Sequence, residues 1–147
     1  MSTLAPLLDR AQVGLDVAAS SKKRVLEAVA ERFASPGRDA NKLFSALLER
    51  ERLGTTGLGE GVAIPHARVP GLTEPRLAIL RLAEPVDFDA IDGQPVRIVV
   101  ALLVPEQATE THLEILSELA ERLSRPEVRQ AILAAQTPEA LIAPFRA

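Results

Sequence analysis

The chain has 147 residues, of which 47% are hydrophobic and 25% are charged, and its formal net charge is −3 with a pI of about 5.5. This length fits one domain with a substantial core, the acidic balance argues against a nucleic-acid binder, and no apolar run approaches the roughly 20 residues that a membrane span needs. Cysteine is absent from the sequence, which excludes disulfides, thiolate metal sites and a cysteine nucleophile in this chain.

The start of the chain is predicted to form a short lead and a strand. Residues 1–12 show no clean periodicity and contain Pro6, so we expect an irregular segment or one short helical turn. Residues 1–8 lack the basic start and apolar core of a signal peptide, and a cytoplasmic location is the default expectation. A short strand is expected at residues 13–17, and the basic run at residues 22–24 is expected to be the solvated start of a helix.

Two amphipathic helices are predicted before residue 54. The first is capped by Ser20 or Ser21 and extends to about residue 34, and the second is capped by Asp39 or Asn41 and ends near residue 52. Arg50 therefore lies in the last turn of the second helix. Cations are favoured at helix C-termini in any case, so the spacing leaves open whether Arg50 has a functional or only a structural role.

The segment from residue 57 to residue 68 concentrates the most unusual chemistry in the chain. It has three glycines in five residues, and the short apolar run at residues 62–64 predicts a buried strand. Pro65 lacks a backbone donor and should end that strand. His66 is then expected just past the strand end, where α/β proteins usually place their sites.

His66 is a candidate nucleophile. Its unperturbed pKa of about 6.5 leaves much of the imidazole uncharged near neutral pH, with a free lone pair that can take a phosphoryl group. Amides of a glycine-rich loop and an arginine can offset the charge on the phosphoryl oxygens, and Arg50, Arg52 and Arg68 lie nearby in the sequence. The alternative is a structural histidine at a strand end. Thr56 could likewise contact a phosphate or only close the turn.

The middle of the chain predicts a sheet covered on both faces. A strand is expected at residues 77–82, and a second, shorter one within residues 84–94, with a turn at residues 92–93. The near-continuous apolar strand at residues 96–104 implies that both of its faces are buried. Helices must therefore flank the sheet on both sides, which gives an α/β fold.

The last third of the chain is predicted to be helical. Thr109 is a candidate cap for a helix at residues 110–124, and two shorter helices are expected at 127–135 and 138–145. His112 lies in the first turn of the first of these helices, where the helix N-terminus attracts anions. It is therefore either a site residue or an ordinary half-buried histidine. With only two histidines and no dense carboxylate cluster, no metal site is expected.

Several blocks of the sequence resemble a known family. The blocks are Arg50-Glu51, Gly54-Thr55-Thr56-Gly57-Leu58-Gly59 and Gly61-Val62-Ala63-Ile64-Pro65-His66, with flanking matches at residues 15–24, 101–105 and 111–113. Together they resemble the fructose/mannitol-type enzyme IIA domains of the bacterial phosphoenolpyruvate-dependent phosphotransferase system, and the nitrogen-regulatory subfamily in particular. The resemblance covers nearly the whole chain, so residues 1–147 are expected to form a single domain of this type.

The resemblance implies a fold and a site. The fold is an α/β domain of the phosphotransferase/anion-transporter-like type, with a small mixed β-sheet flanked on both faces by helices. The histidine that matches His66 accepts phosphate on Nε2 from a histidine-containing phosphocarrier protein, and the residues that match Arg50 and His112 face the site. Glu60 lies where relatives do not all keep an acid, and its role stays open.

The expected mechanism needs neither a metal nor another cofactor. Neutral His66 attacks the phosphorus of a donor phosphohistidine, and Arg50 offsets the charge of the transferred group. The loop amides at Gly57 and Gly59, the Thr56 hydroxyl and the first turn of the His112 helix bind the phosphoryl oxygens.

Three functions are compatible with these residues. The chain could be a regulator whose phosphorylation state is read by target proteins, or a transport component that passes phosphate to a separate sugar-specific IIB protein. A fused IIB domain is excluded, because IIB normally uses a cysteine and the sequence contains none. The third reading is a non-catalytic interaction module in which His66 is structural.

Overall fold

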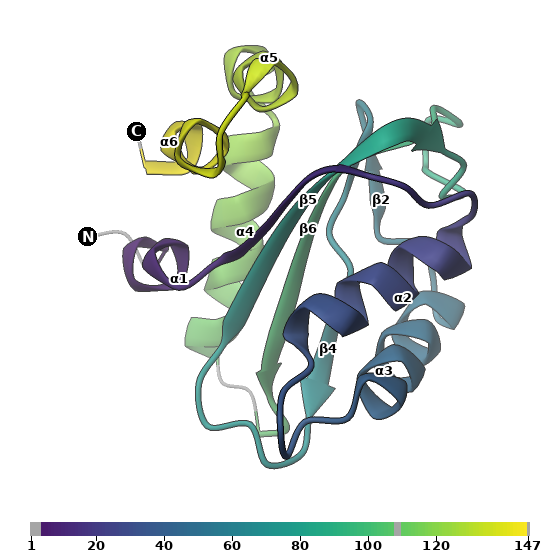
Figure 1. Cartoon of the computed structure of the whole chain (residues 1–147), viewed down its shortest axis with the longest axis vertical. Helices are drawn as coiled ribbons and strands as arrows, with labels where there is room; N and C mark the ends of the chain where they lie inside the picture. Colours follow the sequence, from purple (N-terminus) through teal and green to yellow (C-terminus); the bar gives the residue numbers. More distant parts are fainter. Residues whose placement is uncertain (1–3, 108–109, 147) are drawn as a thin grey trace.

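The computed structural model describes residues 4–107 and 110–146, which form a β-sheet between two layers of helices (Figure 1). In the described ranges no helix is both long enough and apolar enough to cross a membrane. The elements in chain order are α1 (Ala5–Asp9), β1 (Gln12–Val17), α2 (Lys22–Phe33), α3 (Ala40–Arg52), β2 (Gly57–Gly59), β3 (Val62–Ala63), β4 (His66–Val69), β5 (Arg76–Val86), β6 (Val96–Pro105), α4 (Glu110–Leu123), α5 (Pro126–Ala134) and α6 (Pro138–Arg146).

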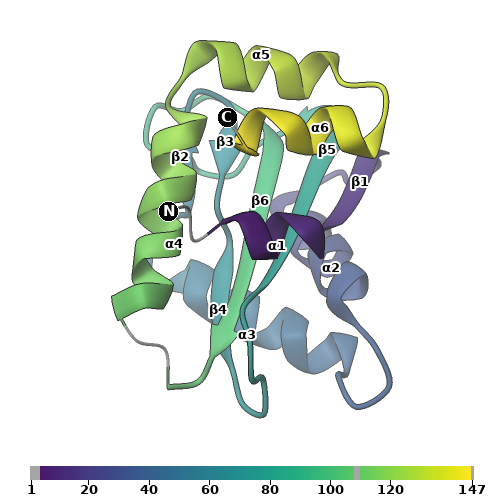
Figure 2. The ribbon, with the colours of Figure 1, turned by 90° about the vertical axis from the view of Figure 1, so that its left-hand side faces the viewer.

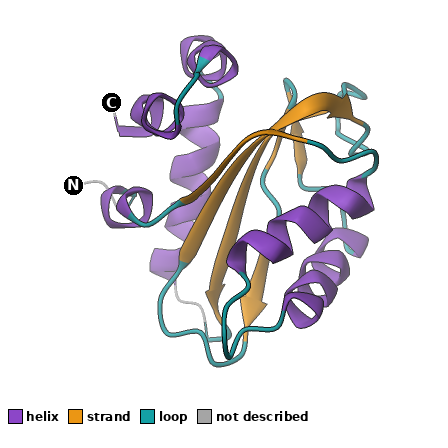
Figure 3. Cartoon of the chain, viewed as in Figure 1, coloured by secondary structure: helices purple, strands orange, loops and turns teal. Residues whose placement is uncertain are grey.

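The sheet is mixed, as the family resemblance implies. Its strand order is β1-β5-β6-β3-β2, and β4 also pairs with β6. The central pair β5 and β6 is antiparallel, whereas β1 is parallel to β5, and both β3 and β4 are parallel to β6. The strands lie between helices on both sides (Figure 3). Strand β6 is paired with other strands at both of its edges and covered by helices on both faces. The burial of both faces explains why nearly all of its residues are apolar.

Alternation along the central strands supplies two separate cores. Leu77 and Ile79 of β5 point to one face of the sheet, and Ala78 and Leu80 point to the other, as the two-residue period of a strand requires. The first face packs against α1, α4, α5 and α6, which lie together in Figure 2, and the second packs against α2 and α3. The prediction of helices on both faces is therefore confirmed.

The predicted starts of the first two long helices are also confirmed. The Ser21 hydroxyl accepts a hydrogen bond from the Arg24 amide at 3.2 Å, and the Asp39 carboxylate accepts one from the Asn41 amide at 3.0 Å. The short lead is helix α1, with Pro6 in its first turn, where a missing amide hydrogen costs nothing. The cap predicted at Thr109 lies outside the described residues.

The strand expected within residues 84–94 is wrong as a separate element. Residues 84–86 are the end of β5, and Val86 pairs with Val96 after a register shift that begins beyond Arg81. Pro85 suggested a break, but a proline only removes one donor, and an irregular stretch of strand tolerates it. The turn predicted at residues 92–93 is present, with the Gly93 amide donating to the Ala90 carbonyl at 2.9 Å.

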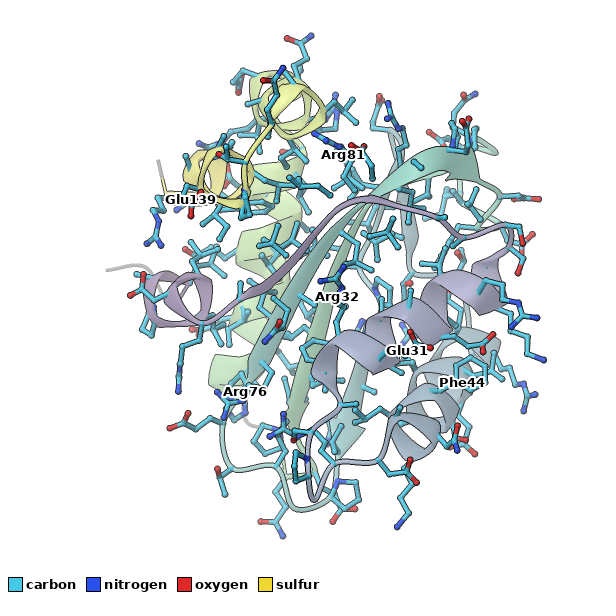
Figure 4. All side chains as sticks on the ribbon, in the orientation of Figure 1. Glu31, Arg32, Phe44, Arg76, Arg81 and Glu139 are labelled. Atoms are coloured by element: carbon cyan, nitrogen blue, oxygen red, sulfur yellow. The ribbon has the colours of Figure 1, made fainter. Side chains whose placement is uncertain are left out.

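Arg81 joins three elements in the interior. Its guanidinium binds both oxygens of the Asp16 carboxylate at 3.1 Å and donates to backbone carbonyls at the end of α5, including that of Ile132 at 3.1 Å. Figure 4 shows the Arg81 side chain beside α5. Only 6% of Arg81 is exposed. Its hydrogen bonds link β1, β5 and α5.

Candidate functional site

His66 is placed at a break between two short strands. Strands β3 and β4 pair with successive parts of β6, and His66 is the first residue of β4, opposite Leu102. His66 does lie just past the end of β3, as expected, but the expectation that it stands outside the sheet is wrong, because β4 begins at His66. Pro65 does interrupt the strand, but its carbonyl accepts a hydrogen bond from the Leu102 amide at 2.9 Å, and pairing resumes immediately. The imidazole therefore projects from the sheet at a position within the length of β6, opposite Leu102.

Two contacts fix the protonation pattern of the His66 ring. Nδ1 lies 2.9 Å from the carbonyl oxygen of Ile64, which can only accept a hydrogen bond, so Nδ1 carries the proton. Nε2 accepts a hydrogen bond from Arg50 Nε at 3.2 Å and is therefore the nitrogen with the lone pair. Arg50 is itself fixed by a bond from Nη1 to the Gly54 carbonyl at 3.1 Å. The structure thus brings together His66 and Arg50, which are 16 residues apart.

The surroundings of His66 favour its neutral form. Burial lowers the pKa of the imidazole below its ordinary value of 6.5, and the Arg50 guanidinium lowers it further. The hydrogen bond to the Ile64 carbonyl and the Glu51 carboxylate act in the opposite direction without reversing the shift. An imidazole that is uncharged at neutral pH can act as a nucleophile through Nε2.

A cavity of about 720 Å³ opens at His66. Arg50 and His112 also line it, so helix α4 brings the second histidine to the same cavity as the first. Arg52 and Arg68 line it as well, and the remaining wall is largely aliphatic. Two of its leucines are well exposed, Leu53 at 84% and Leu113 at 53%.

A smaller cavity of about 260 Å³ shares His66 and Arg50 with the first. Thr56 and Ser117 both line it, the first from the glycine-rich loop and the second from α4. The sequence pattern did not single out Ser117, because a serine within a helix is unremarkable until the fold brings it to the same cavity as the loop. The space around the imidazole is therefore lined by hydroxyl and guanidinium groups, which can donate to an anion.

Glu51 is a buried acid beside the site that the sequence pattern also did not single out. Its carboxylate accepts from the Thr56 amide at 2.8 Å and from the Thr56 hydroxyl at 2.7 Å. It also lies 2.9 Å from Lys22 Nζ at the start of α2. Lys22 was expected to be a solvated residue, but this pair draws it inward. The predicted contact of Thr56 with phosphate stays a prediction, because its hydroxyl hydrogen is shared with Glu51 in this structure.

The two glycines predicted to bind phosphate have structural reasons of their own. The Gly57 amide donates to the Thr55 hydroxyl at 3.0 Å, and an added Cβ at Gly57 would lie 3.0 Å from the Cα atom of Ala90. Gly59 has a φ of +102°, and an added Cβ there would lie 3.1 Å from the Asp92 carboxylate. Close packing against residues 90–92 therefore accounts for both glycines, and their role towards phosphate stays a prediction.

Glu60, whose role the sequence left open, pairs with a different helix. Its carboxylate lies 3.7 Å from the guanidinium of Arg129 on α5, and its amide donates to the Asp92 carboxylate at 2.9 Å. Its φ of +56° places it in the tight turn between β2 and β3. Among the residues that the structure describes, no three metal-ligating side chains are grouped so that they could hold an ion.

The sheet between two helical layers, with a neutral histidine facing an arginine in a cavity, is an arrangement suited to holding a phosphoryl group. The chain belongs to the family described as "Phosphoenolpyruvate-dependent sugar phosphotransferase system, EIIA 2", whose model matches residues 6–147. As a member of that family it is a phosphotransfer component of the system, and the family exchanges phosphate with partner proteins.

Within this family the chain is similar to nitrogen regulatory proteins. It is 50% identical over 129 residues to the nitrogen regulatory protein of Pseudomonas aeruginosa, which covers 86% of this chain and 84% of that one. It superimposes on the crystal structure of the nitrogen regulatory protein IIA-Ntr from Neisseria meningitidis with a TM-score of 0.91 at 38% identity, covering 96% and 99% of the two chains. It is also 36% identical over 141 residues to the fructose-specific EIIA component of Haloferax volcanii, covering 95% and 90%.

Proposed function

We propose that His66 is the residue on which this chain carries the phosphoryl group. The observation that supports this most strongly is the orientation of the ring, with Nδ1–H bound to the Ile64 carbonyl and the Nε2 lone pair facing Arg50 in a cavity. In the transfer, Nε2 forms a bond to the phosphorus of a donor phosphohistidine. The donor N–P bond breaks, and its electron pair returns to the donor imidazole.

Arg50 has two successive roles in this proposal. Before transfer it donates to Nε2, which holds the ring in place but also occupies the nucleophilic lone pair. On approach of the donor, the guanidinium has to shift from Nε2 to the phosphoryl oxygens, and its bond to the Gly54 carbonyl keeps it close. His112 lines the larger cavity and Ser117 the smaller one, so both can supply further donors. Thr56 also lines the smaller cavity, but its hydroxyl must first release its hydrogen bond to Glu51.

The proposed donor is a histidine-containing phosphocarrier protein that docks over the cavity mouth. Leu53 and Leu113 expose apolar surface at this mouth, and surface leucines grouped around a reactive residue are typical of a protein contact. A partner that carries its own phosphohistidine must bring it to within bonding distance of Nε2. A shallow cavity rimmed by apolar side chains suits such an approach.

The use to which the phosphoryl group is put is proposed to be regulatory. Two of the three relatives described above are nitrogen regulatory proteins, including the one with 50% identity. The alternative, donation to a separate sugar-specific IIB protein, is favoured by the likeness to a fructose-specific component. Assay of the phosphorylated chain against the sugar-specific IIB proteins of its organism separates the two, because a regulator donates to none of them.

Phosphorylation from phosphoenolpyruvate tests the proposed acceptor. Incubation with phosphoenolpyruvate, enzyme I and the phosphocarrier should add one acid-labile phosphoryl group to the wild type and none to His66→Ala, as measured by intact mass. His112→Ala is the matched control and should still be labelled. A wild type that gains no mass would support the interaction module, and labelling of His66→Ala would disprove the proposed acceptor.

A further inference from the structure

Four arginines line a third cavity, at the opposite edge of the sheet. This cavity, of about 310 Å³, is lined by Arg10, Arg32, Arg38 and Arg76 and shares no lining residue with the two cavities at His66. It lies beside β1 and the start of β5, whereas His66 lies across β6 on β4. Arg32 comes from α2 and Arg76 from the start of β5, and both are labelled in Figure 4. We refer to it as the arginine cavity.

The positive charge of the arginine cavity is only partly compensated. No carboxylate is among its described lining residues, and Glu74, which lies 2.6 Å from Arg10 and 3.9 Å from Arg76, is the one acid paired with them in the described ranges. The C-terminal end of α2 contributes about half a negative charge more. More than two positive charges are left in one cavity of a chain whose net charge is −3.

Backbone contacts hold two of these guanidinium groups in place. Arg32 donates to the Val13 carbonyl at 3.3 Å, which directs its guanidinium towards β1. Arg38 donates to the Phe33 carbonyl at 3.4 Å. The turn at residues 35–38, closed by a pair of backbone hydrogen bonds, returns Arg38 to the end of α2. These backbone contacts direct Arg32 and Arg38 towards the same cavity.

We propose that the arginine cavity binds a small anion that carries two or more phosphate groups. Guanidinium groups bind phosphate oxygens through paired hydrogen bonds, and several of them around one cavity favour a ligand with several charges. The one aromatic lining residue, Phe33, is 4% exposed, so the cavity offers no ring on which a nucleobase could stack. A compact diphosphate or polyphosphate fits this chemistry. The proposal does not depend on the role of His66.

Calorimetric titration with inorganic pyrophosphate at constant ionic strength tests this proposal. The wild type should bind pyrophosphate, and the double variant Arg32→Gln/Arg38→Gln should bind it at least about tenfold more weakly, because two charge-assisted contacts are removed. Arg24→Gln, on the same helix but outside the cavity, is the matched control and should bind as the wild type does. Arg50→Ala should also bind normally, which separates this site from the one at His66.

A second measurement on the unaltered chain covers the case in which the double variant is unstable. Backbone amide shifts recorded during the pyrophosphate titration should change at residues 32–38 and 74–77. Orthophosphate should bind at least about tenfold more weakly than pyrophosphate, since it engages fewer guanidinium groups. Absence of binding at millimolar pyrophosphate, equal affinity for the two anions, or shifts centred on residues 50–56 and 66 would each overturn the proposal.

Discussion

At the residue scale, the properties of His66 follow from its two nearest polar neighbours. The Ile64 carbonyl, two positions earlier in the chain, accepts a hydrogen bond from Nδ1–H, and Arg50 donates to Nε2. His66 and Arg50 were predictable from the sequence as candidate site residues, because a histidine beside a glycine-rich loop with an arginine nearby is an unusual combination. Glu51 was not predictable in the same way, since an acid in a helix becomes informative only when the fold buries it.

Replacement of Arg50 by alanine should slow phosphoryl acceptance by about tenfold to a hundredfold, because the charge on the transferred oxygens is no longer offset. Rapid-quench measurement of phosphoryl transfer from the phosphocarrier gives the rate, and circular dichroism checks the fold. Arg52→Ala is a useful control, because Arg52 lines the same cavity without a hydrogen bond to His66 among the contacts described. An Arg50→Ala variant that accepts phosphate at the wild-type rate would remove Arg50 from the site.

The lowered pKa of His66 predicts how stability depends on pH. The folded chain binds this proton less tightly than the unfolded chain, whose imidazole has its ordinary value of 6.5. The contribution of His66 to stability is therefore complete above that value and is lost as the pH falls through the lower, folded pKa. Acidification from about pH 7.5 to about pH 5 should destabilise the wild type more than His66→Gln.

Urea unfolding of both proteins across this pH range measures the difference, and NMR titration of the His66 ring gives the folded midpoint directly. We expect the pKa of the His66 ring to lie below its ordinary value of 6.5, mainly because the ring is buried. A midpoint above it, or the same pH dependence in the two proteins, would contradict the described environment of the ring.

At the element scale, the Lys22–Glu51–Thr56 cluster connects α2, α3 and the glycine-rich loop. Glu51 is the centre of this cluster, with 3% of its side chain exposed against 22% for that of Lys22. The loop held by Glu51 leads directly into β2. The next strand, β3, begins three residues after the end of β2 and ends before His66. The position of the imidazole therefore depends on a helix–loop contact that lies outside the sheet.

Replacement of Glu51 by alanine should lower the free energy of unfolding by roughly 3 kcal/mol, because Lys22 and the Thr56 amide lose a buried partner. Urea denaturation measures this loss. Glu49→Ala, on an exposed position of the same helix, should change stability by less than about 0.5 kcal/mol. A Glu51→Ala variant as stable as Glu49→Ala would show that the cluster does not hold the loop.

Local patterns predicted the elements better than their junctions. The helices at residues 22–33 and 40–52 were predictable from caps and spacing, because these signals lie within a few residues of one another. The resumption of the strand at His66 was not, since it depends on a hydrogen bond between Pro65 and Leu102, which are far apart in the sequence. The end of β5 beyond Pro85 was missed for the same reason.

At the scale of the whole molecule, the reactive edge and the arginine cavity lie on opposite sides of β5 and β6. The apolar run at residues 96–104 made it predictable that the sheet is covered on both faces, whereas its mixed pairing was implied only by the resemblance to the family. The arginine cavity was not predictable from net charge, which is acidic. Arg32 and Arg76 are far apart in the chain, and they line one cavity because α2 packs on the sheet beside β5.

The apolar rim of the larger cavity predicts where the phosphocarrier binds. Leu53→Asp should weaken phosphocarrier binding about tenfold, because a charge replaces an apolar contact. Stability should change little, since 84% of Leu53 is exposed. Ile91→Asp is the matched control, because Ile91 is 81% exposed and lies outside the cavity. Surface plasmon resonance measures both affinities, and equal effects of the two substitutions would contradict docking at this rim.

We expect the phosphoryl group to be carried by a single nitrogen, Nε2 of His66. Long-range ¹H–¹⁵N NMR of the phosphorylated protein identifies that nitrogen, because the ring shifts of Nδ1-phosphohistidine and Nε2-phosphohistidine differ. We predict a single phosphohistidine, at Nε2 of His66, with the proton retained on Nδ1 and donated to the Ile64 carbonyl. Phosphate at Nδ1 of His66, or on His112, would contradict it.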